Sequence, residues 1–292
     1  MKTYLAFDIG GTDLKYGVIN NDQEIIYHSK TKTDAHLGGK SILDKIIKLS
    51  LPLIETYKPS GVAVSTAGVV NSDTGLILDA TNAIPNYIGI NVIDYLQSQL
   101  NLPVSIENDV NCMCLCEAHL GVARNSNHFV ALTIGTGIGG AIYTNNRILS
   151  GTSYSAGEIG MMTIEGDVFE NIASTRALVN KVQALLPELN IKNGVDVYKL
   201  YDDNHPIVKK IVEEFYRILG IGIANLVYVL NPEYVVIGGG ITERATFVKE
   251  LTKYIEPRLT DYLKSKTKIV AASYKNNAGM MGAYLNFISR NK

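Results

Sequence analysis

Two glycine-rich turns constrain the fold of this chain more than any other feature. One is Gly10-Gly11-Thr12, which follows Asp8-Ile9, and the other is Gly135-Thr136-Gly137, which follows Thr133-Ile134. Glycine reaches positive φ and carries no side chain, so the backbone N–H groups of such a turn can converge on an anion. We interpret the pair as two strand–turn–strand units, each opening one half of a duplicated architecture.

The segments around the turns show the patterns of two α/β halves. Apolar and polar residues alternate over 3–8, 14–20 and 24–31, which predicts an antiparallel meander. The pattern recurs over 129–134 and 141–144, with a turn from Gly135 to Gly140 between them. Further strands are expected at 61–65, 104–107 and 234–237, and helices at 41–57, 91–100, 109–120 and 207–230. We expect Pro52 to kink or shorten the first of these helices.

The resulting expectation is a two-domain α/β protein with a cleft between the domains. The first domain would comprise residues 1–117 and a C-terminal helix at about 277–292, and the second would comprise residues 118–276. The chain has 292 residues, of which 46% are hydrophobic, and this is sufficient for cores in two domains.

The charge balance and the distribution of apolar residues exclude several classes of protein. Lys and Arg number 27 and Asp and Glu 28, so no basic excess is present to hold nucleic acid. The first residues lack the pattern of a signal peptide, and no apolar stretch reaches the roughly 20 residues of a membrane-spanning helix. We expect a cytoplasmic protein with neither nucleic acid nor a membrane as a partner.

Three cysteines lie close together, at Cys112, Cys114 and Cys116. Their odd number and their crowding argue against a disulfide framework. On a helix, Cys112 and Cys116 would share a face and Cys114 would point away, which does not suit a metal site. We expect small buried thiols.

The second turn also fits the glycine spacing of a dinucleotide-binding loop, with Gly135, Gly137 and Gly140 in the required places. That loop must open a helix, whereas residues 141–144 have the chemistry of a strand. The sequence therefore disfavours hydride transfer. A tight hairpin that needs only glycine geometry is the simpler alternative for either turn taken alone.

Five motifs, in order along the chain, resemble those of the ROK family of sugar kinases, within the actin-like, ribonuclease-H-like superfamily. They are Asp8-Ile9-Gly10-Gly11-Thr12 with Lys15, Glu107-Asn108-Asp109-Val110-Asn111, Thr133 to Gly140, Ala156-Gly157-Glu158-Ile159-Gly160, and Ile237 to Gly240. The resemblance implies two ribonuclease-H-like (actin-like ATPase) domains that close over a sugar and Mg-ATP. It also implies transfer of the γ-phosphoryl group to a hexose 6-hydroxyl.

The resemblance further implies which residues bind the nucleotide. The two turns would cradle the phosphates, Asp8 would lie near Mg²⁺ through water, and the loop of Gly238 to Gly240 would flank the adenosine. The residues expected to bind ATP are Asp8, Gly10, Gly11, Thr12, Lys15, Thr133, Gly135, Thr136, Gly137, Gly239 and Gly240.

Asp109 is the candidate catalytic base. Phosphoryl transfer needs a carboxylate that orients the attacking hydroxyl and accepts its proton. Asp109 lies where a predicted strand ends and a helix begins, a position at the rim of a cleft in α/β folds. The alternative is that Asp109 only caps or charges this helix.

The resemblance implies that the sugar is bound by residues from several segments. They are Gly68, Asn82, Asn108, Asp109, Glu158 and Glu170. Glu158 could instead be an ordinary loop carboxylate, and Glu170 could be a residue that starts a helix.

The sequence departs from the family pattern at a zinc-binding loop. Most members have a histidine three residues after the first glutamate, where this chain has Met161, and their cysteine loop is replaced here by residues 165–169. Methionine and valine cannot supply a tetrahedral shell of nitrogen and sulfur ligands. We predict no zinc, and a loop held by apolar packing of Val168 and Phe169.

Among family members, the sequences that lack the zinc loop look most like β-glucoside kinases, which act on cellobiose and related glucosides. N-acetylmannosamine kinases and glucokinases are close alternatives. A sugar-responsive transcriptional regulator of the same family is an alternative of another class, although the N-terminal DNA-binding domain of those proteins is not recognisable here. Family members are commonly homodimers.

Overall fold

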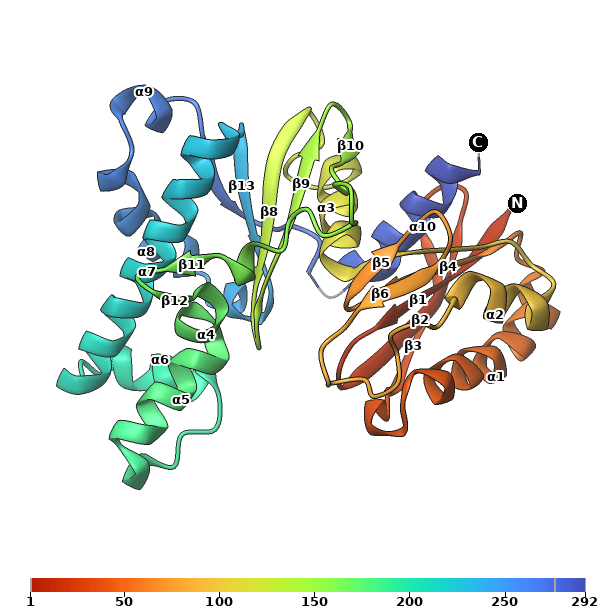
Figure 1. Cartoon of the computed structure of the whole chain (residues 1–292), viewed down its shortest axis with the longest axis horizontal. Helices are drawn as coiled ribbons and strands as arrows, with labels where there is room; N and C mark the ends of the chain where they lie inside the picture. Colours follow the sequence, from red (N-terminus) through yellow and green to blue (C-terminus); the bar gives the residue numbers. More distant parts are fainter. Residues whose placement is uncertain (1, 276, 292) are drawn as a thin grey trace. The chain divides into compact units, whose positions relative to one another are not determined.

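The computed structural model describes residues 2–275 and 277–291. Met1, Asn276 and Lys292, which fall within the predicted domain ranges, lie outside the described residues. The described chain forms two compact units (Figure 1): unit 1 contains residues 2–120, 150–156 and 277–291, and unit 2 contains residues 121–149 and 157–275. No helix among the described residues combines the length and the apolar character needed to cross a membrane.

Unit 1 is built on a five-stranded mixed sheet with the order β3-β2-β1-β4-β7. Its strands are β1 (Thr3–Ile9), β2 (Asp13–Asn20), β3 (Ile25–Lys32), β4 (Val62–Thr66) and β7 (Val104–Asn108). The first three strands are antiparallel neighbours, which confirms the predicted meander, whereas β1, β4 and β7 are parallel. A separate hairpin follows β4 and consists of β5 (Val69–Asn71) and β6 (Leu76–Asp79).

Helices cover both faces of this sheet. They are α1 (Gly39–Tyr57), α2 (Val92–Leu100), α3 (Asp109–His119) and α10 (Ala278–Arg290). α1 and α2 share one hydrophobic core with Leu5, Phe7 and Ile9 of β1. On the opposite face, Tyr284 of α10 meets Tyr4 of β1 with ring centroids 5.3 Å apart, and α3 packs beside α10 (Figure 1). The alternation along β1 therefore assigns its even-numbered residues to the α10 face.

Unit 2 is built on a second five-stranded mixed sheet with the order β10-β9-β8-β13-β14. Its strands are β8 (His128–Ile134), β9 (Ile138–Thr144), β10 (Arg147–Ile148), β13 (Tyr234–Gly238) and β14 (Lys268–Ala271). β8, β9 and β10 are antiparallel neighbours, and β8, β13 and β14 are parallel. The two sheets therefore repeat one strand order, as the predicted duplication requires.

The helices of unit 2 and a short hairpin complete its core. They are β11 (Thr163–Ile164), β12 (Asp167–Val168), α4 (Phe169–Ala173), α5 (Thr175–Leu185), α6 (Gly194–Asp202), α7 (Pro206–Leu230), α8 (Phe247–Ile255) and α9 (Asp261–Lys264). α7 is the long helix in Figure 1, and α4, α5, α6 and α8 pack against it. Its residues Leu219, Ile223 and Val227 are buried in the core of unit 2, whereas Tyr228 and Val229 are exposed.

Two local details differ from the prediction. α1 continues through Pro52 to Tyr57, so Pro52 does not shorten this helix, and a kink at Pro52 stays a prediction; the buried Ile46 and Leu53 hold both sides of the proline against the core. The second turn is also shorter than predicted, because β9 already begins at Ile138. A side chain at Gly140 would lie 2.4 Å from Ile159, so this glycine permits close packing of the strand rather than forming part of the turn.

Candidate active site

A row of polar residues crosses the carboxyl ends of three parallel strands in unit 1. The strand register aligns Asp8 of β1 with Ser65 of β4, and Ser65 with Glu107 of β7. Ser65 Oγ donates a hydrogen bond to Asp8 Oδ1 at 2.8 Å. Asp8 belongs to the α10 face, and a Cβ added to Gly279 of α10 would lie 2.4 Å from its carboxyl carbon. The carboxyl edge of such a sheet is where α/β proteins bind ligands.

The first glycine turn closes the β1–β2 hairpin next to Asp8. Gly10 N donates to Asp13 O at 3.1 Å, and Thr33 Oγ1 donates to Gly10 O at 2.6 Å. Gly11 and Thr12 are exposed at the tip, and the space around Gly11 is open. Lys15 of β2 places its Nζ atom 3.6 Å from Asp8 Oδ2. The structure thus brings together all the residues of this turn that were predicted to bind phosphate and Mg²⁺.

Glu107 is a buried carboxylate that the sequence analysis quoted but gave no role. Only 4% of its surface is exposed, and it accepts hydrogen bonds from Ser72 Oγ at 2.7 Å, Asn108 N at 2.8 Å and Asn111 Nδ2 at 2.9 Å. A buried charge is tolerated when donors of this kind satisfy it. Glu107 therefore ties the turn between β5 and β6 to the start of α3.

Asn108 and Asp109 lie at the N-terminus of α3. Asn108 Oδ1 accepts hydrogen bonds from the N–H groups of Val110 and Asn111, so Asn108, not Asp109, caps the helix. Asn108 Nδ2 donates to Gly68 O and to Asp109 Oδ1, each at 3.1 Å. Asp109 is partly exposed. This arrangement fixes a carboxylate, without burying it, at the same sheet edge as Asp8.

The predicted sugar-binding residues of unit 1 are only partly brought together. Gly68, Asn108 and Asp109 form one connected group through the hydrogen bonds of Asn108. Gly68 has a φ of 100°, and a Cβ there would lie 2.7 Å from Asp79 O, so the close approach requires glycine. Asn82 is exposed in the segment between β6 and α2.

The second glycine turn, Gly135 to Gly137, closes the β8–β9 hairpin and is held by residues that follow β12. Thr175 N and Arg176 N of α5 donate to Gly135 O at 2.9 and 3.4 Å. Glu170 Oε2 accepts from Ile138 N at 3.3 Å. A Cβ added to Gly137 would lie 2.5 Å from the same carboxylate oxygen. Glu170, predicted to bind the sugar, thus lies directly against the turn predicted to bind phosphate.

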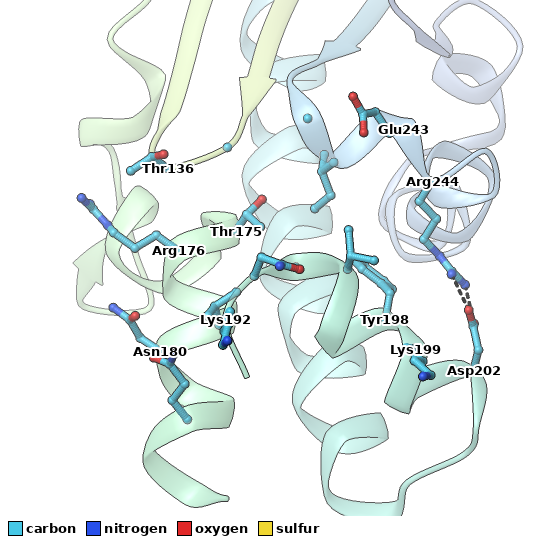
Figure 2. Close-up of a pocket in the computed structure, with 18 of the residues that line it drawn as sticks. Thr136, Thr175, Arg176, Asn180, Lys192, Tyr198, Lys199, Asp202, Glu243 and Arg244 are labelled. Carbon is cyan, nitrogen blue, oxygen red and sulfur yellow. Dashed lines mark hydrogen bonds and ion pairs between the residues drawn. The ribbon is translucent and has the colours of Figure 1, made fainter. Parts of the chain in front are cut away.

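Unit 2 contains a cavity of about 1020 Å³ that begins at this turn. Figure 2 shows Thr136 and Arg176 on one side of it, and Tyr198, Asp202 and Arg244 on the other. Arg244 is firmly held, because it donates to Asp202 at 2.8 Å and to Glu250 at 2.8 Å, and its guanidinium lies 4.6 Å from the centroid of the Tyr198 ring. This size suits a bound nucleoside, since ligand pockets measure roughly 300–1,000 Å³.

The loop of Gly238 to Gly240 reaches the same cavity. Gly239 has a φ of 90°, and a Cβ on it would lie 2.5 Å from Ile134 O at the end of β8. This contact joins the end of β13 to the second turn. Gly240 lines the cavity and has open space in place of a side chain. The structure therefore gathers Gly135, Thr136 and Gly240, three of the residues predicted to bind ATP, around one pocket.

Residues 163–168 form a hairpin instead of a cysteine loop. The turn between β11 and β12 carries Glu165, whose carboxylate pairs with Arg217 of α7. Phe169 is fully buried in the core of unit 2, as predicted, whereas Val168 is only partly buried. Glu158 and Met161 are exposed. Within residues 2–275 and 277–291, no group of three or more His, Cys, Asp or Glu side chains could hold a metal ion.

The three cysteines are buried thiols on α3, as the sequence predicted. Burial, together with the nearby carboxylates of Glu107 and Asp8, raises the pKa of the Cys112 thiol well above its ordinary value. Burial also raises the pKa of Cys114 and Cys116. A neutral thiol is a poor nucleophile and a poor metal ligand.

Sequence reasoning missed several residues of these sites. The hydrogen bond from Ser65 to Asp8 was not predicted, and Arg176 and Lys192, which line the cavity, were not singled out. A serine in register with an acidic strand end was a usable signal for Ser65. No motif marks Arg176 or Lys192, because both reach the cavity from segments that carry no glycine turn.

The chain is similar to known proteins over nearly its whole length. Residues 4–289 match the ROK family. The beta-glucoside kinase of Listeria innocua is 36% identical, over 97% of this chain and 96% of that protein. The solved structure of the Lmo2764 protein from Listeria monocytogenes has a TM-score of 0.89 and 34% identity, over 99% of this chain and 100% of that one.

A ROK family protein from Streptococcus pneumoniae, solved in complex with sucrose, has a TM-score of 0.86 and 28% identity, over 99% of this chain and 98% of that one. These likenesses extend over both units. They confirm the fold class that the resemblance implied, two ribonuclease-H-like α/β domains.

Proposed function

We propose that this chain, which belongs to the ROK family of sugar kinases, transfers the γ-phosphoryl group of ATP to the 6-hydroxyl of a β-glucoside such as cellobiose. The observation that carries the proposal is the polar edge of the unit 1 sheet. There Asp8, Ser65, Glu107 and Asp109 lie at the ends of adjacent parallel strands, with the first glycine turn beside them. In this arrangement Asp8 would hold a cation, Asp109 would accept the proton of a hydroxyl group, and the turn would bind phosphate.

ATP would be bound by both glycine turns and by the cavity of unit 2. The turns would hold phosphates through backbone N–H groups, with Lys15 contributing its charge from β2. The adenosine would occupy the cavity, with Gly135, Thr136 and Gly240 around it. Thr12, Thr133, Gly137 and Gly239 would complete the nucleotide-binding set.

Asp8 fits the needs of Mg²⁺. The ion keeps several waters and is typically bound by one or two carboxylates and substrate phosphates. The Asp8 side chain is 15% exposed, and Ser65 fixes one of its oxygens, so a single oriented carboxylate is available. When bound, Mg²⁺ neutralises charge that develops on the transferring phosphoryl group. Asp8 would hold the ion through water.

Asp109 would act as the base for the sugar hydroxyl. Its carboxylate is fixed by hydrogen bonds from Asn108 Nδ2 at 3.1 Å and Val110 N at 2.9 Å. Such orientation matters because a base contributes only when it lies within hydrogen-bond reach of the proton that it accepts. Glu107 would support it from behind through Asn108 and Asn111. Gly68, Asn82, Glu158 and Glu170 would contact the other sugar hydroxyls.

A β-glucoside is the favoured acceptor for two reasons. The Listeria innocua relative, 36% identical, is a beta-glucoside kinase. Met161 stands where most family members have a histidine, and it is 53% exposed. Losing that polar contact would leave room for an aglycone. N-acetylmannosamine kinase and glucokinase remain the alternatives, and a homodimer in the cytoplasm remains the expected state.

An acceptor panel tests the substrate. The purified full-length chain would be assayed with Mg-ATP and, in turn, cellobiose, N-acetylmannosamine, glucose and N-acetylglucosamine. We expect the highest kcat/KM with cellobiose. A higher value with any other sugar would overturn the acceptor while leaving the kinase intact, and no turnover with any of the four would overturn the kinase proposal as stated.

A pair of aspartates tests the base. Asp109→Asn should lower kcat by about 100- to 10,000-fold, the range for loss of a general base. Asp94→Asn is the matched control, because Asp94 also lies in the first turn of a helix, α2, and is exposed there. It should leave kcat unchanged. Full turnover by the Asp109→Asn variant would show that Asp109 only charges the helix terminus.

A further inference from the structure

Arg176 occupies a distinctive position beside the second glycine turn. It is the second residue of α5, and its own N–H group donates to Gly135 O at 3.4 Å. Its side chain lines the unit 2 cavity on the same side as Thr136 (Figure 2). The glycine turn and a guanidinium thus lie at one end of the pocket, and both favour an anion.

The partner of Arg176 in this structure is Glu170. Arg176 Nη2 lies 3.9 Å from Glu170 Oε1, and the arginine side chain is 49% exposed. The other carboxylate oxygen, Oε2, faces the turn: it accepts from Ile138 N at 3.3 Å and abuts Gly137. Glu170 therefore touches the phosphate turn with one oxygen and the arginine with the other.

The ion pair between Glu170 and Arg176 is weaker than the ion pairs that Arg244 makes in the same pocket. Arg244 makes hydrogen bonds of 2.8 Å to two carboxylates and stacks on Tyr198, so it is fixed as part of the wall. Arg176 has one long contact at a half-exposed site, and such pairs contribute little. A phosphate would be a better partner, because guanidinium binds it through two parallel hydrogen bonds.

We propose that Arg176 is a phosphate-binding residue that Glu170 holds back until the sugar is bound. The proposal rests on the proposed function, in which Glu170 binds sugar hydroxyls and the turn binds the phosphates of ATP. Sugar hydroxyls that hydrogen-bond to Glu170 draw its carboxylate away from Arg176, and the released guanidinium turns to the nucleotide. Sugar and nucleotide then bind with positive coupling, which by linkage is the same in both directions.

Titration calorimetry on the full-length chain measures this coupling. The Kd of Mg-AMPPNP is determined without sugar and with saturating cellobiose, and again with glucose. We expect sugar to tighten nucleotide binding about 5-fold in the wild type, a coupling at the lower end of the usual range because the pair that breaks is weak. Arg176→Gln should bring this ratio to about 1.

Two further variants separate coupling from simple charge. Lys192→Gln removes another cation that lines the same cavity. It should weaken nucleotide binding equally with and without sugar, so the ratio stays at the wild-type value. Arg176→Lys keeps the charge but not the planar fork, and should retain part of the coupling.

The outcomes distinguish this inference from the function on which it rests. A wild-type ratio of 1, or an unchanged ratio in Arg176→Gln, overturns the role of Arg176 while nucleotide and sugar still bind. Failure of the wild type to bind Mg-AMPPNP and every sugar overturns the proposed function and this inference together. If Arg176→Gln does not fold, as judged by its thermal unfolding, the ratio in Arg176→Lys decides: full wild-type coupling there overturns the proposal.

Discussion

The two units repeat one strand order but differ in the chemistry of their strand ends. At the end of β1, Asp8 is aligned with Ser65 of β4, whereas the matching position of β8 is Thr133, aligned with Gly238 of β13. Unit 1 therefore offers a carboxylate held by a hydroxyl, and unit 2 offers a hydroxyl next to bare backbone. The first arrangement suits a hydrated cation and the second suits an anion.

The two turns are also anchored differently. In unit 1 the side chain of Thr33 donates to Gly10 O at 2.6 Å. In unit 2 the corresponding support comes from backbone N–H groups of α5 and from Glu170. The two units therefore share one backbone frame, but the residues at their strand ends and turns differ. Matched substitutions in the two units should therefore have unequal effects.

The largest difference in kcat loss between matched variants is expected at the ends of β1 and β8. Asp8→Asn should lower kcat at least about 100-fold, since it removes the charge that would hold Mg²⁺, and loss of one preorganised electrostatic contact typically costs 100- to 1,000-fold. Thr133→Val, at the matching position of unit 2, should cost less than about 10-fold. Steady-state kinetics over a Mg²⁺ titration measures both. Equal losses in the two variants would contradict the inference that the two strand ends serve different ligands.

The next difference is expected at two glycines that lie against carboxylates, Gly279 beside Asp8 and Gly137 beside Glu170. A Cβ at Gly279 would lie 2.4–2.6 Å from all three carboxyl atoms of Asp8, which Ser65 also holds, so Asp8 cannot easily yield. A Cβ at Gly137 would meet only the end of the Glu170 side chain, at 2.5 Å from its nearest oxygen. Asp8 can therefore move away from an added methyl group less easily than Glu170 can.

We expect Gly279→Ala to lower kcat about 10- to 100-fold through displacement of Asp8, and to destabilise the fold by about 1–3 kcal/mol. Gly137→Ala should instead raise the KM for the sugar by less than about 10-fold, because Glu170 can rotate away. Kinetics and thermal unfolding of both variants provide the measurement. A larger kcat loss in Gly137→Ala than in Gly279→Ala would contradict this order.

These contacts also mark the limit of what the sequence could predict. The strand–turn–strand units were predictable because alternation and glycine placement are local, and the register then fixed Asp8 beside its neighbours. Asp109 was predictable at a strand–helix boundary for the same reason. The extent of the second turn could not be predicted, because glycines in a strand and glycines in a turn look the same in the local sequence. Only the contact of Gly140 with Ile159 shows that Gly140 belongs to the strand.

Contacts between segments that are distant in the sequence could not be predicted. The approach of Gly279 to Asp8 depends on how α10, from the far end of the chain, packs on the sheet. The contact of Glu170 with Gly137 depends on the fold of the β11–β12 hairpin. Neither follows from propensity or periodicity, which describe one segment at a time. The resemblance supplied a sugar-binding role for Glu170 but not its position against the turn.

A third pair tests the turns themselves. Gly11 and Gly135 both have open space where a Cβ would be, and neither has a positive φ. Alanine at either position should leave stability unchanged or raise it by about 0.4–1 kcal/mol, and should raise the KM for ATP roughly 5-fold by keeping phosphate from the backbone. Gly239→Ala is the contrast, because its φ of 90° and its contact with Ile134 O should destabilise the fold by roughly 1–2 kcal/mol. An unchanged KM for ATP in both turn variants would argue that the turns need glycine only for their own geometry.

The smallest expected difference concerns the two-stranded hairpin that each unit adds to its sheet. Asp73, between β5 and β6, accepts hydrogen bonds from Tyr154 Oη at 2.6 Å and Arg290 Nη1 at 2.7 Å, and these hold the pKa of Asp73 below its ordinary value. Glu165, between β11 and β12, has its pKa lowered by hydrogen bonds from Arg217. Both carboxylates are exposed, but Asp73 joins three segments of its unit and Glu165 only two.

A carboxylate whose pKa is lower in the folded chain stabilises the fold above its unfolded pKa, and this contribution is lost as the pH falls through the folded value. Asp73→Asn should therefore lower stability at pH 7 by about 0.2–1 kcal/mol, the range for an exposed ion pair. The deficit should shrink as the pH falls below about 4, where the wild-type carboxylate takes up its proton. Glu165→Gln should show the same pH dependence with a smaller deficit. Thermal unfolding at pH 7, 5, 4 and 3 tests both variants. A stability deficit in Asp73→Asn that is as large at pH 3 as at pH 7 would mean that Asp73 acts through its shape and neutral hydrogen bonds rather than through its charge.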